Sequence, residues 1–349
     1  MSINILVLSC GTRNKIVSYF KKELAGRGKV VAADSSPLAP ALYEADEAVI
    51  IPRIQDADYL ETLLALCKEK NIKAVFSLID PELNLLAKHR YDFLAVGAIP
   101  IVSEVEKVEM CFDKYSLYEF MTQLQIPTPK SYLEEHEFLQ DMREGQITFP
   151  VILKPYDGSA SMQIHKVHSS DEMGSLMACD DHFMIQEFMD GTEIGADVYV
   201  DLLSGKVISI FTKEKIKMRA GETDKSRSIK DGKLFDLIQS VVEKVGLTGM
   251  LDIDLFRVGD EYKISEINPR FGGGYPHAYE CGVSFPQMIL NNLQGKINSP
   301  QIGAYEADVY MAKYNELKII PATKLAKEMM ISLPTPDVAA SSRIGLSTQ

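Results

Sequence analysis

Short apolar runs alternate with segments of helical apolar spacing over the first hundred residues. The pattern covers apolar runs at residues 3–8, 29–34, 47–51 and 74–78, and helical stretches around 16–24 and 59–70. Strands that alternate with helices predict an open, parallel, doubly wound sheet. We therefore expect residues 1–105 to form an α/β N-terminal domain.

The loop Ser9–Thr12 and Asp34, at the end of the second run, suggest a dinucleotide site, because ligands gather at the carboxyl ends of parallel strands. Only Gly11 is present where the dinucleotide fingerprint requires three glycines. We interpret the loop as a structural turn, and a dinucleotide oxidoreductase is the less favoured alternative.

The pattern changes after Pro100, where antiparallel strand pairs joined by short turns predict an α+β region. Asp113 is a good N-cap for a helix that follows it. The expected strands cover residues 149–155, 163–167, 183–188, 193–200, 207–212, 249–256 and 264–268. We expect this region to span 106–310, with a lid subdomain at about 125–190, a catalytic subdomain at about 191–310, and a C-terminal extension at 311–349 whose end, from Pro334, is poorly ordered.

The composition is that of a globular protein, with 46% hydrophobic residues in 349 and a net charge of −12. Negative charge disfavours non-specific binding to nucleic acid or anionic membranes, so an anionic ligand needs a local basic patch. The five cysteines lack paired spacing, which indicates reduced thiols. The N-terminus has no signal-peptide pattern and no apolar run is long enough to span a membrane, so we expect a cytoplasmic protein.

Acidic and amide side chains recur at every second position of two predicted strands. Asp252 and Asp254 lie on one and Glu266 and Asn268 on the other, with a hairpin turn at 258–261 between them. Residues two apart share a strand face, so the two sets can meet. Clustered carboxylates repel unless a cation neutralises them, and Mg²⁺ suits oxygen ligands. The alternative is an exposed hairpin with a solvated acidic face.

Four cations also recur at period two, at Lys213, Lys215, Lys217 and Arg219. A strand here places them on one face, which is unfavourable unless an anion lies opposite. The alternative is a solvated edge strand that uses lysine to resist aggregation.

Two further segments suit a nucleotide. Lys154 ends an apolar strand and precedes the small-residue loop 156–162, in which backbone amides can approach a phosphate. The strand end Gln186–Met189 offers backbone groups to a purine edge, and Glu193 can accept hydrogen bonds from ribose hydroxyls.

In this order, Asp113-Lys114, Lys154-Pro155, Gln186-Glu187-Phe188, Asp254 and Glu266-Ile267-Asn268-Pro269-Arg270 resemble the ATP-grasp superfamily. The resemblance covers roughly residues 1–300 and is strongest to the branch with carbamoyl-phosphate synthase large chains and amino-acid carboxylate–amine ligases. One departure is Ala160, where much of the family has glycine.

The resemblance implies a role for each matching residue. The nucleotide would be held through its phosphates by Lys114, Lys154, Gly158, Ser159 and Ser161, through adenine by Glu187, Phe188 and Met189, and through the ribose by Glu193. Two Mg²⁺ ions, replaceable by Mn²⁺, would be bound by Asp254, Glu266 and Asn268. The catalytic residues would be Arg270 and Arg219, which would contact the reacting phosphoryl group or the substrate. His277 is open to interpretation as a base or as a structural histidine.

The resemblance implies an ATP-dependent ligase that activates a small carboxylic acid, such as an amino acid, as an acylphosphate for attack by an amine. Its partners would be those two small molecules and a second copy of the chain, without nucleic acid or membrane. Two alternatives stay open: an enzyme like carbamoyl-phosphate synthase that phosphorylates bicarbonate or carbamate, and a nucleotide-binding regulatory protein with a silent site.

Overall fold

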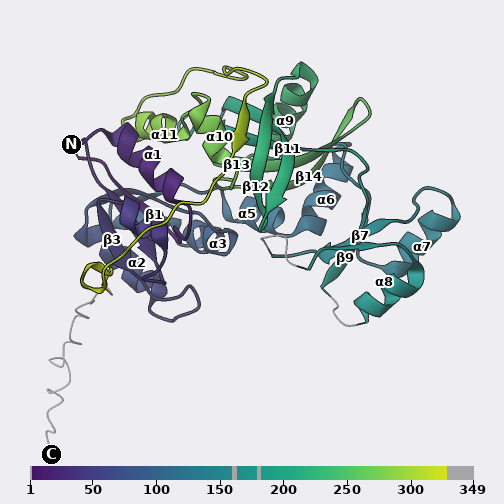
Figure 1. Cartoon of the computed structure of the whole chain (residues 1–349), viewed down its shortest axis with the longest axis horizontal. Coiled ribbons are helices and arrows are strands. Elements are labelled where there is room, and N and C mark those ends of the chain that lie inside the picture. Colours follow the sequence, from purple (N-terminus) through teal and green to yellow (C-terminus); the bar gives the residue numbers. More distant parts are fainter. Residues whose placement is uncertain (1, 159–162, 179–181, 328–349) are drawn as a thin grey trace, which may run out of the picture.

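The computed structural model describes residues 2–158, 163–178 and 182–327. Its N-terminal domain contains a five-stranded sheet in which all neighbours are parallel, in the order β3-β2-β1-β4-β5 (Figure 1). The strands are β1 (Asn4–Leu8), β2 (Val30–Asp34), β3 (Glu47–Ile50), β4 (Ile72–Ser77) and β5 (Ile99–Pro100). The accompanying helices are α1 (Asn14–Leu24), the 3₁₀ helix Pro40–Glu44, α2 (Tyr59–Glu69), α3 (Asp80–Lys88) and α4 (Arg90–Ala95). The predicted α/β sheet is confirmed.

The loop after β1 is stabilised by the acid that had suggested a dinucleotide site. The Asp34 carboxylate accepts hydrogen bonds from the backbone N–H groups of Gly11, at 2.8 Å, and Ser36, at 2.9 Å. Gly11 has a positive φ of 46°, which glycine adopts at low cost. Asp34 therefore stabilises the loop that follows β1, as predicted for a structural turn.

Two helices connect the N-terminal sheet to the rest of the chain. They are α5 (Val105–Phe112) and α6 (Lys114–Gln123). Asp113 caps α6 as predicted, because its side chain accepts from the N–H groups of Tyr115 and Ser116.

A small antiparallel sheet follows, in the order β6-β9-β7-β8, with its own hydrophobic core. Its strands are β6 (Ser131–Tyr132), β7 (Val151–Pro155), β8 (His165–Val167) and β9 (Phe183–Glu187), and its helices are α7 (Glu135–Arg143) and α8 (Ser170–Met177). It lies to one side of the large sheet, away from the N-terminal domain (Figure 1).

The third sheet is antiparallel, in the order β14-β13-β10-β11-β12-β15. Its strands are β10 (Thr192–Val200), β11 (Val207–Arg219), β12 (Glu222–Ile229), β13 (Gly249–Val258), β14 (Glu261–Asn268) and β15 (Tyr310–Ala312). The remaining helices are α9 (Gly232–Val245), α10 (Tyr275–Glu280), α11 (Phe285–Leu293) and the 3₁₀ helix Ala322–Lys324. The predicted strand at 207–212 was too short, because β11 continues through the basic stretch to Arg219.

An aromatic core joins the N-terminal domain to the large sheet. Phe271 is 1% exposed, and its ring centroid lies 6.1 Å from that of Phe20 and 5.6 Å from that of Phe76, both in the N-terminal domain. On its other side it packs against Tyr275, at 4.8 Å, and Phe285, at 6.3 Å. The loop that follows β14 is thereby fixed between the two domains.

The chain finally returns to the N-terminal domain. After β15 it crosses from the large sheet to the first sheet, where the Lys327 carbonyl accepts from the Ile50 N–H at 3.2 Å (Figure 1). The Tyr43 hydroxyl oxygen accepts a hydrogen bond from the Ala326 N–H at 3.2 Å. The predicted disorder from Pro334 lies outside the described residues.

We expect Phe271→Ala to lower the free energy of unfolding by about 3–5 kcal/mol, because it empties a ring-sized volume in this interdomain core. Urea denaturation followed by circular dichroism measures the change. Tyr91→Ala, at a position that is 82% exposed, is the control and should change stability by less than about 0.5 kcal/mol. Equal effects of the two substitutions would contradict the assigned packing.

Candidate active site

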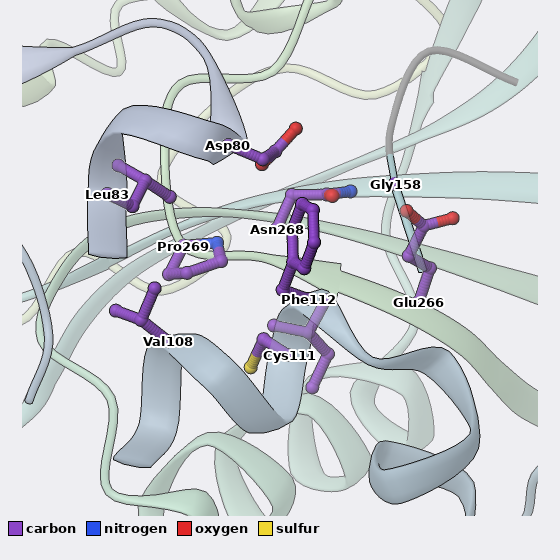
Figure 2. Close-up of a pocket in the computed structure, with 10 residues that line it drawn as sticks. Asp80, Leu83, Val108, Cys111, Phe112, Gly158, Glu266, Asn268 and Pro269 are labelled. Carbon is purple, nitrogen blue, oxygen red and sulfur yellow. The ribbon is translucent and has the colours of Figure 1, made fainter. Parts of the chain in front are cut away.

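Four oxygen-bearing side chains meet on the adjacent strands β13 and β14. Asp254 lies opposite Glu266, and Asp252 lies opposite Asn268. The predicted meeting of these side chains across the two strands is confirmed. The alternative of a solvated acidic hairpin is wrong, because β13 is an interior strand and the Asp252 side chain is only 16% exposed. Glu266 and Asn268 project toward the space between α3 and the loop after β7 (Figure 2).

The electrostatics of this group suit a divalent cation. Burial and the neighbouring charge of Asp254 raise the pKa of Asp252 to about 7. Asp254, Glu266 and Asn268 offer hard oxygen donors, as Mg²⁺ prefers. In the described part of the chain no group of three or more His, Cys, Asp or Glu side chains forms a metal site. The set of two carboxylates and one amide thus fits an ion that takes its other ligands from water and phosphate.

Two of the four predicted cations neutralise carboxylates of the same sheet. The buried Lys213 forms an ion pair with Asp197, and Lys215 Nζ lies 2.8 Å from Glu193 Oε1 and 2.6 Å from Asp254 Oδ1. Burial opposes the charged form of Lys215, but Asp254 and Glu193 outweigh it and raise the pKa of this lysine. The expected opposing anions are therefore protein side chains.

The regular alternation of these cations ends after Lys215. Register shifts between Lys215 and Met218 interrupt the pairing of β11 with β12, so the prediction of four cations on one face was wrong. The edge-strand alternative was wrong as well, because β11 lies between β10 and β12. Arg219 lies at the end of the strand, 2.8 Å from Asp224 Oδ1, with 48% of its side chain exposed.

The predicted phosphate-binding lysines lie close together at the end of β7. Lys114 Nζ donates to the Gly158 carbonyl at 2.7 Å, and its backbone N–H donates to Tyr156 O at 2.7 Å. Lys154 is 6% exposed and forms no ion pair with any described residue. Burial, with a smaller contribution from Lys114, lowers the pKa of Lys154, although Glu266 opposes this. A buried ammonium that has no ion-pair partner among the described residues suits an anionic ligand. Ser159 and Ser161 lie outside the described residues.

The predicted adenine segment follows β9. The Glu187 carboxylate accepts from Lys263 Nζ at 3.0 Å and from the Lys130 N–H at 3.1 Å, which links the small sheet to β14. The Lys166 ammonium lies 3.6 Å from the ring centroid of Phe188, and Met189 is buried. The adenine contacts stay a prediction for this segment, as the ribose contact does for Glu193.

Sequence reasoning missed the partner of Arg270. Its Nε lies 2.7 Å from Asp80 Oδ1 and its Nη2 2.9 Å from Asp80 Oδ2, a two-point ion pair between domains. Both side chains are about one-tenth exposed. The signal was present: Asp80 follows β4, at the edge of the parallel sheet where ligands gather. The N-terminal domain thus orients the guanidinium of Arg270.

The helix that carries Asp80 is fixed by a second acid, Glu82. Its carboxylate accepts from the hydroxyls of Ser9, at 2.6 Å, Tyr59 and Ser77. Burial raises the pKa of Glu82. These bonds tie α3 to the ends of β1 and β4.

A cavity of about 850 Å³ lies beyond the loop that follows Arg270. Its walls come from α1 and the loop before it, the end of β11 with Arg219, the glycines Gly272 and Gly273, α10, and residues 309–318. The glycines are required there, because a Cβ at Gly272 would lie 2.3 Å from Asp252 Oδ1 and one at Gly273 would lie 2.8 Å from the Glu222 side chain. This explains two of the three glycines that follow the acidic strand.

His277 is buried at the cavity wall and is held by two hydrogen bonds. It is 2% exposed, its Nε2 lies 3.1 Å from the Val309 carbonyl, and its Nδ1 lies 2.8 Å from Ser226 Oγ. The carbonyl only accepts, so Nε2 carries the proton and Nδ1 accepts from the hydroxyl. Burial, with the nearby charge of Lys213, lowers the pKa of His277 to about 4.

Comparison with known proteins matches this arrangement to two family models. A PylC-like N-terminal domain matches residues 5–102, and an ATP-grasp domain matches residues 111–274. Residues 111–274 thus form an ATP-grasp domain. The resemblance inferred from the sequence is confirmed, because the chain combines this domain with a PylC-like N-terminal domain.

The curated relatives of this ATP-grasp chain are distant. A carbamoyl-phosphate synthase of Methanobrevibacter smithii is 27% identical over 279 residues, which cover 74% of this chain and 72% of the relative. A D-alanine--D-alanine ligase of Lacticaseibacillus casei is 26% identical, with 49% of this chain and 54% of the relative covered.

Solved structures share the fold at lower identity. The biotin carboxylase domain dimer of Hydrogenobacter thermophilus 2-oxoglutarate carboxylase, in complex with MgADP and bicarbonate, has a TM-score of 0.71 at 18% identity, covering 89% of this chain and 73% of that one. Staphylococcus aureus N5-carboxyaminoimidazole synthetase with ADP has a TM-score of 0.67 at 14% identity, covering 86% and 80%.

The cysteines and the helices bear on two further predictions. Cys10, Cys67, Cys111 and Cys281 are free thiols, as predicted, and Cys179 lies outside the described residues. No helix in residues 2–158, 163–178 and 182–327 combines the length and apolar character that a membrane span requires.

We expect Asp80→Asn and Arg270→Gln each to lower the free energy of unfolding by about 3 kcal/mol, because each leaves a buried charge unpaired. The double variant should lose at least about 1 kcal/mol less than the sum of the two. Denaturant titration of all four proteins measures this coupling. Strictly additive losses would contradict a direct ion pair.

We also expect His277 to make stability depend on pH. The pKa of His277 is lower in the folded chain than in the unfolded chain. Between about pH 6.5 and 4, His277 is therefore protonated in the unfolded chain and neutral in the folded chain. Stability should fall by up to about 3 kcal/mol as the pH is lowered through that window. Unfolding of wild type and His277→Gln at several pH values tests this, because the variant should lack that component. His136→Gln, at an exposed position, should retain it.

Proposed function

We propose that the chain is a ligase that uses ATP to join a small carboxylic acid, such as an amino acid, to an amine. The observation that carries the proposal is the position of Arg270. Glu266 and Asn268, which line a small pocket together with Gly158, precede it in the chain, and Gly272 and Gly273, which line the cavity of about 850 Å³, follow it. Arg270 thus connects the proposed nucleotide-binding groups to a substrate-sized space.

The proposed reaction has two steps. A carboxylate oxygen of the acid attacks the γ-phosphorus of ATP, the bond to the β-phosphate oxygen breaks, and ADP leaves with the electron pair. The amine nitrogen then attacks the acyl carbon, phosphate leaves with its bonding electrons, and the nitrogen loses a proton to give an amide. Neither step needs a nucleophile from the enzyme.

The residues of this chain divide the work of binding and charge stabilisation. Lys114, Lys154 and the loop from Gly158 through Ser159 and Ser161 would hold the phosphates, the segment Glu187–Met189 would hold adenine, and Glu193 the ribose. Arg270, oriented by Asp80, would stabilise the charge that spreads over the transferred phosphoryl group. Arg219, at the cavity wall, would contact substrate.

Asp254, Glu266 and Asn268 would hold Mg²⁺, in two ions or with Mn²⁺ in its place, and the metal would neutralise phosphate charge when bound. Lys215 neutralises Asp254 in the absence of the metal. Asp254 would therefore be shared between Lys215 and the metal.

An enzyme like carbamoyl-phosphate synthase is the second candidate, and the 27% identical relative of that name favours it. Its substrates, bicarbonate and carbamate, are far smaller than a cavity of about 850 Å³. The cavity volume therefore favours larger substrates. A silent regulatory protein is the third candidate. Against it stands the buried Lys154, which has no ion-pair partner among residues 2–158, 163–178 and 182–327.

We further propose that the protein acts in the cytoplasm as a homodimer on small molecules, without nucleic acid or membrane. The net charge of −12 supports the absence of polyanionic partners. The biotin carboxylase domain with the same fold is a dimer.

The decisive experiment measures ADP and phosphate release with acids and amines supplied in pairs. We expect release that requires both partners, and a Glu266→Gln variant that is at least about 10³-fold slower, because the metal site loses a charge. The variant should keep the melting temperature of the wild type within a few degrees.

Glu261→Gln is the matched control, because this exposed acid begins the same strand and should leave the rate unchanged. Stimulation by bicarbonate alone would select the second candidate, and tight ATP binding without turnover would select the third. A wild-type rate in Glu266→Gln would refute the assigned metal role.

A further inference from the structure

The C-terminal segment 309–318 encloses the cavity beside the proposed reaction site. Its strand β15 pairs with β12, and the chain then passes along the cavity toward the N-terminal domain, where Lys318 Nζ lies 2.7 Å from Glu44 Oε1 (Figure 1). The opposite wall is formed by α1 and the loop before it. Three distant parts of the sequence thus enclose one space.

A basic pair from two of these parts meets a single carboxylate at the cavity wall. Glu222, at the start of β12, has its Oε1 2.7 Å from Arg13 Nε and its Oε2 2.8 Å from Lys313 Nζ. Burial would raise the pKa of Glu222, but Arg13 and Lys313 outweigh it and hold the pKa below its usual value. Two cations share one anion, so the cluster carries a net charge of +1.

This cluster retains donors for a second anion. In the part of the chain that the structure describes, Arg13 uses Nε for Glu222 and Nη1 for the Phe271 carbonyl at 3.4 Å, and Lys313 Nζ has Glu222 as its partner. A guanidinium has five N–H donors and an ammonium has three. Both side chains are between one-fifth and one-quarter exposed. The geometry of a carboxylate bound by two cations is therefore already built.

The basic pair lies beside the proposed reaction site. Arg13 Nη1 and Arg270 Nη1 both donate to the same oxygen, the Phe271 carbonyl, at 3.4 and 3.1 Å. The walls of the cavity include none of the residues proposed to bind the nucleotide. A substrate anchored at Arg13 would therefore approach Arg270 from the side opposite ATP.

The direction of approach indicates which of the two substrates enters through this cavity. The acid must lie between the γ-phosphate and the amine, because its oxygen attacks phosphorus and its carbon then receives the nitrogen. A molecule that enters from the far side is the amine. We propose that the amine substrate is an amino acid, and that Arg13 and Lys313 bind its free carboxylate while its amino group points toward Arg270. This inference rests on the proposed ligase activity and adds the substrate class and its anchor.

The test uses amines in matched pairs, each amino acid beside its carboxamide, with the acid supplied at saturation and ADP release as the signal. We expect the KM of the carboxamide to be about 10–100-fold higher, because one charge-assisted contact to each cation is lost. Diamines that lack the carboxylate should behave like the carboxamides.

Two variants connect this preference to the basic pair. Lys313→Gln should raise the KM of the amino acid about 10-fold or more, leave kcat within about 2-fold, and leave the KM of the carboxamide unchanged. Arg13→Gln should act in the same direction. Lys324→Gln is the control, because this exposed lysine follows the segment 309–318 and does not line the cavity.

The outcomes separate this inference from the ligase proposal. If no amine supports ADP release, the ligase proposal fails and this inference falls with it. If carboxamides and diamines work as well as amino acids, or if Lys313→Gln raises the KM of the acid in place of that of the amine, the ligase proposal stands and the carboxylate anchor is refuted.

Discussion

The structure depends on the neutralisation of half-buried carboxylates on β10, β13 and β14. Asp197 and Asp254 are paired with Lys213 and Lys215, whereas the ion pair of Asp252 with Arg270 is longer, at 3.7 Å. The pKa of Asp252, raised to about 7, reflects this incomplete compensation. A sheet with such a concentration of oxygen donors is stable because lysines balance most of it, and the remaining imbalance favours a bound cation.

Paired charges also connect the N-terminal domain to the large sheet. Asp80 of the N-terminal domain fixes Arg270, and Glu82 fixes the helix from which Asp80 projects. Phe271, the residue after Arg270, is packed among aromatic rings of both domains. The N-terminal domain is therefore a structural part of the candidate site as well as a wall of the proposed substrate cavity.

Local features of the fold could be predicted from the sequence, because they depend on neighbours in the chain. The parallel sheet, the Asp113 cap and the pairing of Asp254 with Glu266 follow from periodicity and turn signals. The partner of Arg270 could not be predicted, because Asp80 is 190 positions away. The counter-charges of Lys213 and Lys215 were missed for the same reason, because they lie on β10 and β13, which the tertiary structure brings beside β11. The basic pair at Glu222 combines three such distant segments.

The central claim is that Asp254, Glu266 and Asn268 bind a metal ion that is also coordinated by the triphosphate of ATP. The most direct test is a crystal structure with a non-hydrolysable ATP analogue and Mn²⁺, in which anomalous scattering locates the metal. The account predicts an anomalous peak within bonding distance of oxygens from these three side chains and from the phosphates, with Lys114 and Lys154 on the same triphosphate. A nucleotide bound elsewhere, or a metal without contact to β13 and β14, would contradict it.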